Sequence, residues 1–93
     1  MLNGHYTPEQ VRFEIKKLIA IVTEREPEEV SDTASFKDEL GVDSLMAMEV
    51  MISVDRKFKI DIPEDDFTRI TNVDDAVEIV MRYLPQSGVL SAS

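Results

Sequence analysis

The sequence contains no cysteine, and cations are scarce: its 93 residues hold 19 Asp and Glu against 10 Lys and Arg, a net charge of −9. Without cysteine the chain has no disulfide framework, no thiolate metal site and no thiol nucleophile, and it suits a reducing compartment. The negative charge repels nucleic acid and anionic membranes, so we exclude both as partners. A large charged partner should instead carry a basic patch.

Long apolar runs are also missing. No segment approaches the roughly 20 residues of a membrane span, and residues 1–20 lack the pattern of a signal peptide, so we expect no membrane association and a cytoplasmic location. The chain is nevertheless 43% hydrophobic, which supplies the core of one domain. We expect a folded domain over residues 7–85, with flexible ends at residues 1–6 and 86–93.

The spacing of apolar residues predicts helices and no strand. Each expected helix has recognisable start and stop residues, because Thr, Asp and Asn cap helices and proline interrupts them. The first helix begins after Thr7 with Pro8 and Gln10 in a capping box and ends before Pro27, the second spans 44–58 after Asp43 or Ser44, a short third spans 63–67, and the fourth runs from Asn72 to Pro85. The fold class is therefore all-α, a small four-helix bundle of three longer helices and one short helix, with a long first loop.

That first loop covers residues 24–43 and carries eight acids against two bases. A loop of about 20 residues is uncommon in a compact domain unless it is functional or anchored by its own side chains. We expect Val30, Phe36 and Leu40 to anchor it. Ser35, with Asp38 three residues later, predicts a short capped turn that Gly41 closes.

The helix over 44–58 has two apolar faces at about 100° per residue. The larger face predicts contact with the core, and Leu45, Met48 and Ile52 form a second stripe on the far side. One interpretation is that the 24–43 loop partly covers this stripe. The other, compatible with the first, is a partner-docking surface with an apolar centre and an acidic rim. The core face consists of Ala47, Val50, Met51, Val54 and Phe58.

Ser44 lies where the acidic loop meets this helix. Its hydroxyl is expected near free backbone N–H groups and the positive end of the helix dipole, where an attached phosphate is stabilised. The alternative is that Asp43 and Ser44 only cap the helix, the usual role of these residue types. The residues alone leave both interpretations open.

Catalysis by Ser44 and metal binding are both disfavoured by the sequence. The only histidine, His5, is about 40 residues away, and the context is not a Gly-x-Ser-x-Gly elbow, so no base is provided for a nucleophilic serine. The acid clusters lack the alternating ligands and central glycine of a calcium-binding EF-hand loop. We expect no catalytic and no metal-ligating residues.

The segment 36–45, Phe-Lys-Asp-Glu-Leu-Gly-Val-Asp-Ser-Leu, resembles the signature of acyl carrier proteins. The resemblance continues through Met48-Glu49-Val50, Phe58, Ile62-Pro63 and Ile70-Thr71, and it covers residues 8–84 without an obvious gap. It implies a carrier domain, not an enzyme, that binds 4′-phosphopantetheine covalently at Ser44. A separate phosphopantetheinyl transferase adds this group from coenzyme A, and its thiol carries the acyl chain as a thioester. The missing cysteine then fits, because the reactive sulfur belongs to the cofactor.

The resemblance also implies how partners recognise the chain. Asp43 and Leu45 belong to the transferase recognition motif, and acyl-loading and condensing enzymes bind the helix surface through basic docking patches. Weak, screened charge contacts suit a monomeric carrier that must bind and release each enzyme quickly. The residues assigned to this surface are Leu45, Met46, Met48, Glu49, Ile52, Asp55 and Arg56.

Two features depart from a housekeeping fatty-acid carrier. Met46 stands where an acid is usual, and Arg56 and Lys57 follow Asp55 where a run of acids is usual. We interpret this as a specialised carrier for fatty-acid, polyketide or related acyl biosynthesis. Because the sequence starts with Met and is about one domain long, we expect a free-standing protein. The alternative is an acidic helical adaptor that binds basic partners through the same surface without a prosthetic group.

Overall fold

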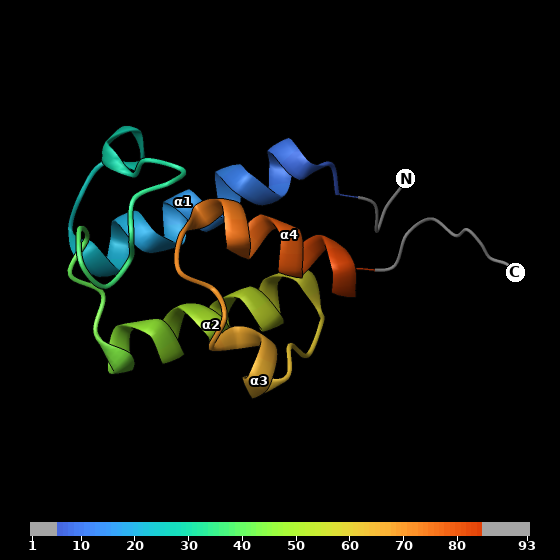
Figure 1. The fold of residues 1–93 in the computed structure, drawn as a ribbon. Coiled ribbons are helices and arrows are strands. Elements are labelled where there is room, and N and C mark those ends of the chain that lie inside the picture. The colour runs from blue at the N-terminus through green and yellow to red at the C-terminus, as the bar shows by residue number, and fades with distance from the viewer. Residues whose placement is uncertain (1–5, 85–93) are drawn as a thin grey trace, which may run out of the picture.

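The computed structural model describes residues 6–84 and, over that range, consists of helices and connecting segments (Figure 1). The predicted flexible ends fall almost entirely outside these residues. Tyr6, which we assigned to the flexible N-terminus, instead packs its ring edge-on against Phe58, with 4.8 Å between ring centroids. The elements are α1 (Pro8–Thr23), η1 (Pro27–Glu29), α2 (Ser44–Phe58), α3 (Glu64–Phe67) and α4 (Val73–Tyr83).

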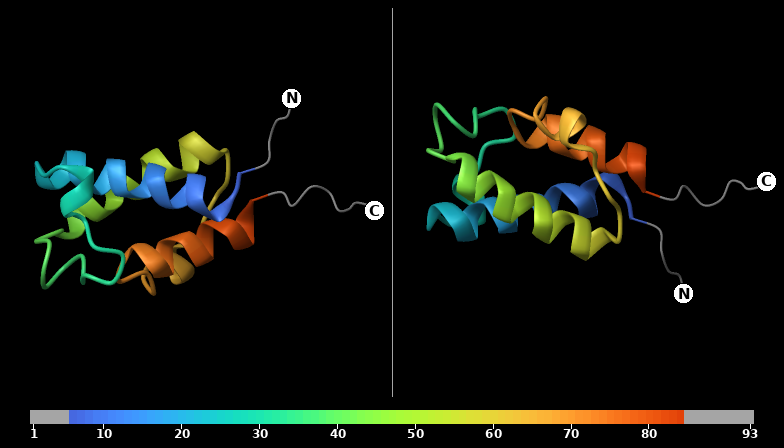
Figure 2. Two further views of the ribbon diagram at one scale, coloured as in Figure 1. Left: turned by 90° about the horizontal axis from the view of Figure 1, so that it is seen from above. Right: turned by 90° about the horizontal axis from the view of Figure 1, so that it is seen from below.

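The all-α four-helix prediction is confirmed, and the three longer helices pack side by side (Figure 2). α1 runs antiparallel to α2 and α4, so the described ends of the chain lie together at one end of the bundle. The loop between α1 and α2, together with the start of α2, lies at the opposite end. Among residues 6–84, no helix has the length and apolar character needed to cross a bilayer.

α1 begins as predicted and ends where the predicted 24–43 loop starts. The Thr7 hydroxyl accepts the Gln10 N–H and the Gln10 side chain accepts the Thr7 N–H, which completes the capping box. The helix ends at Thr23 because Glu24 adopts the left-handed conformation (φ 57°). Pro27 starts the 3₁₀ turn η1 instead, a three-residue element too short to leave a periodic signal.

The other helix boundaries follow the predicted caps closely. α2 spans the predicted residues, and α4 begins after Asn72, whose side-chain oxygen accepts the Asp75 N–H. Pro63 is the N-cap of α3 and not its first residue, since its backbone is extended (ψ 148°). α4 ends at Tyr83, and its C-cap Leu84 has an extended backbone (ψ 142°) directly before Pro85, in agreement with the predicted stop; Pro85 itself lies outside the described residues.

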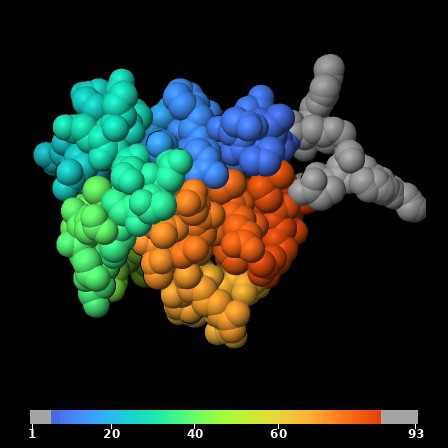
Figure 3. Space-filling model, turned by 45° about the horizontal axis from the view of Figure 1, so that its top comes forward, coloured from blue at the N-terminus to red at the C-terminus, as the bar shows by residue number. Residues whose placement is uncertain are grey.

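One core joins the three long helices and the loop. Val30 and Leu40 are buried and Phe36 packs partly against the core, as predicted, and the loop residues Ala34 and Val42 are buried as well. Figure 3 shows the 24–43 segment lying against the helices on one face. Buried helix residues are Val11, Ile15, Ile19 and Ala20 of α1, Val50, Val54 and Phe58 of α2, and Val73, Ala76, Val77, Ile79 and Val80 of α4.

A charged network ties the loop to two helices. Arg12 of α1 contacts Asp32 of the loop (3.2 Å) and Asp74 of α4 (2.5 Å), and Lys16 also contacts Asp32 (2.6 Å). The hydrogen bond to Asp74 is the main reason that the pKa of Arg12 is raised. The network therefore holds the start of α4 and the loop against α1.

Arg12→Gln is expected to lower the free energy of unfolding by about 0.5–1 kcal/mol, because these side chains remain partly exposed and exposed charge pairs are weak. Thermal melting at low and high salt would measure this, and the difference from wild type should shrink as salt screens the network. Arg82→Gln is the matched control, since within residues 6–84 Arg82 forms an ion pair only with Glu78 on its own helix. Equal losses for the two variants would contradict a specific role for the network.

Candidate functional site

The site is built where the loop enters α2. Ser35 and Gly41 shape the loop: the Ser35 hydroxyl accepts the Asp38 N–H (3.1 Å), and Gly41 adopts a positive φ of 72°, which a residue with a side chain rarely does. The Glu39 carboxylate accepts the Ser35 N–H (3.0 Å), a partner that we did not predict. These bonds confirm the predicted turn and set the direction in which the chain enters the helix.

Asp43, and not Ser44, caps α2. The Asp43 carboxylate accepts the Met46 N–H at 2.9 Å. Ser44 is the first residue of the helix, is exposed, and its hydroxyl has no hydrogen-bond partner within residues 6–84. The sequence left the cap to either residue. Because Asp43 takes this role, the hydroxyl of Ser44 is free for chemistry.

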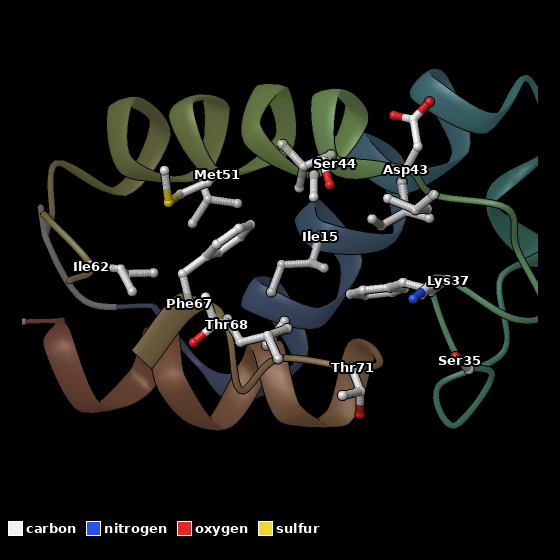
Figure 4. Close-up of a pocket in the computed structure, with 18 of the residues that line it drawn as sticks. Ile15, Ser35, Lys37, Asp43, Ser44, Met51, Ile62, Phe67, Thr68 and Thr71 are labelled. Atoms are coloured by element: carbon white, nitrogen blue, oxygen red, sulfur yellow. The ribbon is translucent and has the colours of Figure 1, made fainter. Parts of the chain in front are cut away.

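Ser44 also borders a cavity of about 680 Å³ between α2, α3, α4 and α1. Asp43 and Lys37 lie at one end of the cavity and Met51 and Ile62 at the other (Figure 4). The ring of Phe67, on the short helix α3, points into the space between α2 and α4. Much of the remaining lining is aliphatic and comes from Ile15, Ile19, Val42, Ala47, Val50, Val54, Ile70, Ala76 and Val80.

The threonine hydroxyls that line this cavity are already used as donors. Thr68 donates to the Asp65 carbonyl (2.9 Å), and Thr71 donates to the Asp75 carboxylate (2.7 Å). α3 is held against α4 by a hydrogen bond from the Tyr83 hydroxyl to Asp66, the main reason that the pKa of Tyr83 is raised. The interior is thus suited to an apolar guest and offers few free polar groups.

The second apolar stripe of α2 faces away from this cavity. Leu45, Met48 and Ile52 are 68%, 52% and 48% exposed, so the interpretation that the 24–43 loop covers them is wrong. Glu49 and Arg56 are exposed beside them. Two other residues assigned to this surface are placed differently. Met46 is half-buried and packs against the core, and Asp55 is half-buried and accepts the Ile62 N–H (3.3 Å).

The charged form of Asp55 destabilises the folded state, because its carboxylate is partly buried. Burial raises its pKa, the hydrogen bond from Ile62 opposes this shift, and the nearby charge of Asp61 adds to the rise. A carboxyl whose pKa is higher in the folded than in the unfolded state favours folding while it is protonated. That contribution is lost as pH rises from below the unfolded value of about 3.9 through the raised folded value.

Asp55→Asn is therefore expected to raise the melting temperature at pH 7, because asparagine keeps an acceptor for Ile62 without the charge. We expect a gain of about 1–3 °C, small because the side chain is only partly buried, in a domain where 1 kcal/mol corresponds to roughly 4–8 °C. Melting curves from pH 3 to 7 should show the gain disappear near pH 3. Glu49→Gln, which neutralises an exposed acid on the same helix, is the control, and a gain that is independent of pH would contradict the argument.

Comparison with known proteins extends these observations. The family model described as the phosphopantetheine attachment site matches residues 14–80. An acyl carrier protein of Phenylobacterium zucineum is 36% identical over 70 residues, which cover 75% of this chain and 89% of the relative. The chain belongs to the acyl carrier protein family. It is thus a carrier and not an enzyme, and the prosthetic group of this family is covalently attached 4′-phosphopantetheine.

Other relatives agree in sequence and in fold. The mitochondrial acyl carrier protein of Neurospora crassa is 33% identical over 79 residues, and the match covers 84% of this chain but only 59% of that relative. A solved acyl carrier protein structure from Enterococcus faecalis superposes with a TM-score of 0.72 at 28% identity, covering 84% of this chain and 99% of that one. The chain is therefore similar in sequence to bacterial and mitochondrial acyl carrier proteins and in fold to a bacterial one.

The residues present fit the prosthetic group. A phosphodiester needs a free hydroxyl and favours the N–H groups at a helix start, and Ser44 provides both. The adjoining cavity would accept an apolar chain attached to such a group. The described residues form no cluster of three or more acids or histidines suited to a metal ion.

Proposed function

We propose that Ser44 is the attachment residue and that the chain carries acyl groups between enzymes. The observation that carries this proposal is the free Ser44 hydroxyl at the border of the cavity, while Asp43 alone caps the helix. No described residue is hydrogen-bonded to Ser44 in the position of a general base, so a separate transferase must activate the hydroxyl. The thiol at the end of the attached phosphopantetheine would carry the acyl group as a thioester.

The interior of the bundle supports an apolar acyl chain as cargo. Val50 and Ala76 contribute aliphatic walls, and Phe67 stands in the space that a chain would enter. Burying each methylene of such a chain is worth about 0.8 kcal/mol. To shelter its cargo, the carrier would displace the side chain of Phe67. A longer acyl chain would then extend through the cavity toward Met51 and Ile62.

The exposed face of α2 supports docking of the transferase and of acyl-loading and condensing enzymes. Leu45, Met48 and Ile52 give it an apolar centre, and methionine adapts to different partners. A small apolar centre with charged neighbours favours short-lived complexes, which suits a monomeric carrier. Three statements remain predictions: the carrier is specialised and free-standing, it serves fatty-acid or polyketide synthesis, and it resides in the cytoplasm. No observation favours the adaptor without a prosthetic group.

The experiment is to incubate the purified chain with coenzyme A, magnesium and a promiscuous phosphopantetheinyl transferase. Intact mass should rise by one phosphopantetheine group, and fragmentation of the proteolysed product should place that group on Ser44. A chain that gains no mass, or that carries the group on another residue, would refute the proposal. The unloaded chain incubated without transferase is the control.

A further inference from the structure

One row of side chains runs along the exposed face of α2 and alternates in character. Leu45, Glu49, Ile52 and Arg56 follow one another at intervals of four, three and four residues, which places them on one side of the helix. All four are exposed. The row therefore reads apolar, acidic, apolar, basic from the Ser44 end toward the end of the helix.

The positive charge of Arg56 is not neutralised by its neighbours. Lys57 is directed away from this face and pairs with Glu14 of α1, with 3.3 Å between Nζ and Oε1. Asp55 is half-buried and its carboxylate accepts the Ile62 N–H. Arg56 itself forms no ion pair with any residue between 6 and 84. Of the three consecutive charged residues Asp55, Arg56 and Lys57, Arg56 is thus the one whose charge is available to a partner.

The two charges of the row are far enough apart to be recognised separately. Glu49 and Arg56 are seven residues apart, about 10 Å along the helix axis at 1.5 Å per residue. This separation exceeds the Debye length of about 8 Å at physiological ionic strength. A partner patch with a single sign of charge would be attracted at one end of the row and repelled at the other.

We propose that the enzyme that loads acyl groups onto this carrier binds α2 with a patch of two opposite charges, cationic over Glu49 and anionic over Arg56. An apolar contact to Ile52 lies between the two. This inference rests on the proposed function, and it adds an anionic part to the basic docking patch that we predicted. Like charges placed opposite each other suppress wrong partners, so Arg56 would exclude enzymes built for a wholly acidic helix.

A second copy of the chain is the competing occupant, because two antiparallel α2 helices would also place Glu49 opposite Arg56. A 15-residue helix is about 22 Å long and 10 Å wide. Its face offers far less than the roughly 800 Å² per partner that a stable complex buries. We therefore assign the face to an enzyme that adds contacts beyond α2.

The test uses Arg56→Glu, with Arg25→Glu as the matched charge reversal at an exposed residue without an ion pair among those described. Both chains and wild type are first loaded with phosphopantetheine in vitro and their masses verified. Each is then supplied, below saturation, to a clarified extract of the cells that encode it, with short-chain acyl-coenzyme A thioesters and ATP. Intact mass gives the initial rate at which acylated carrier forms.

Arg56→Glu should lower this rate by about fivefold, the effect of roughly 1 kcal/mol at one interface charge, and Arg25→Glu should leave it unchanged. Arg56→Gln should give an intermediate rate, which keeps the test valid if the reversal perturbs folding. Glu49→Lys should also slow the reaction. Melting curves of the variants report any loss of fold separately.

Three results would overturn the inference. An equal or faster rate for Arg56→Glu would indicate a uniformly cationic partner. Equal rates for Arg56→Glu and Arg25→Glu would show that enzymes do not recognise this face by charge. Dimerisation of wild type in sedimentation that Arg56→Glu abolishes would assign the face to a second copy. Failure of the initial loading step would instead refute the proposed function, so the two failures remain distinguishable.

Discussion

Replacing Ser44 with alanine should abolish phosphopantetheine incorporation completely while leaving the fold intact. The hydroxyl is the only group at this position that can form the ester, and it makes no hydrogen bond within residues 6–84 that alanine would lose. Asp43 continues to cap the helix, so the melting temperature should change by no more than about 2 °C, as for an exposed substitution worth under 0.5 kcal/mol. Intact mass after transferase treatment and thermal melting provide the two readouts.

Ser53→Ala is the matched control, because Ser53 is another serine on α2 but lies in the helix interior. That variant should be loaded as fast as wild type. Asp43→Ala, unlike Ser44→Ala, should lower the free energy of unfolding by about 1 kcal/mol, because the helix loses its cap. This loss is expected whatever the effect of the variant on loading. Incorporation into Ser44→Ala would show that another residue carries the group.

Filling the cavity should remove protection of the acyl chain without removing the carrier function. Val50→Phe places a ring in the cavity that a chain attached near Ser44 would enter. With an octanoyl group loaded from octanoyl-coenzyme A, we expect wild type to slow thioester cleavage by hydroxylamine about tenfold relative to octanoyl-coenzyme A. This needs only about 1.4 kcal/mol in favour of the sheltered state, less than the burial of several methylenes supplies.

In Val50→Phe the cleavage rate should approach that of octanoyl-coenzyme A. Loading should continue, since the Ser44 hydroxyl is untouched. Octanoylation should raise the melting temperature of wild type, because a guest bound only by the folded state stabilises it, and this increase should vanish in the variant. Ile52→Phe adds an aromatic ring to the outer face of the same helix and is the control. Equal protection in all three chains would show that the chain does not enter this cavity.

Much of the architecture was predictable because its signals are local. Thr7, Asn72 and the Asp43-Ser44 pair mark helix starts by a chemistry that acts over three residues, and each was found at a helix start. The apolar face of α4 was also predictable, because its apolar residues recur at helical spacing within one segment. η1 was missed because three residues cannot show a helical period, and Glu24 was not identified as the C-cap of α1 because its left-handed conformation is uncommon for glutamate.

The site was predictable only in part, because its important features join distant segments. Ser44 was identified from its local motif, and the exposed stripe from helical spacing. The cavity was not predictable in extent, since its walls come from α1, the loop, α2, α3 and α4 together. Neither the pairing of Lys57 with Glu14 nor the bond from Ile62 to Asp55 has a sequence signal. These two contacts decide which charges of α2 remain available to partners.

The direction of the helices has a practical consequence for handling the protein. The chain enters the bundle near Tyr6 and leaves it near Leu84 at one end, and Ser44 lies at the other end of α2, about 22 Å away along its 15 residues. A purification tag, dye or surface linker joined directly at Tyr6 or Leu84 would therefore start on the side remote from the attachment residue. Immobilised carrier would present Ser44 to enzymes in solution, which suits surface-based measurements of the short-lived complexes expected here.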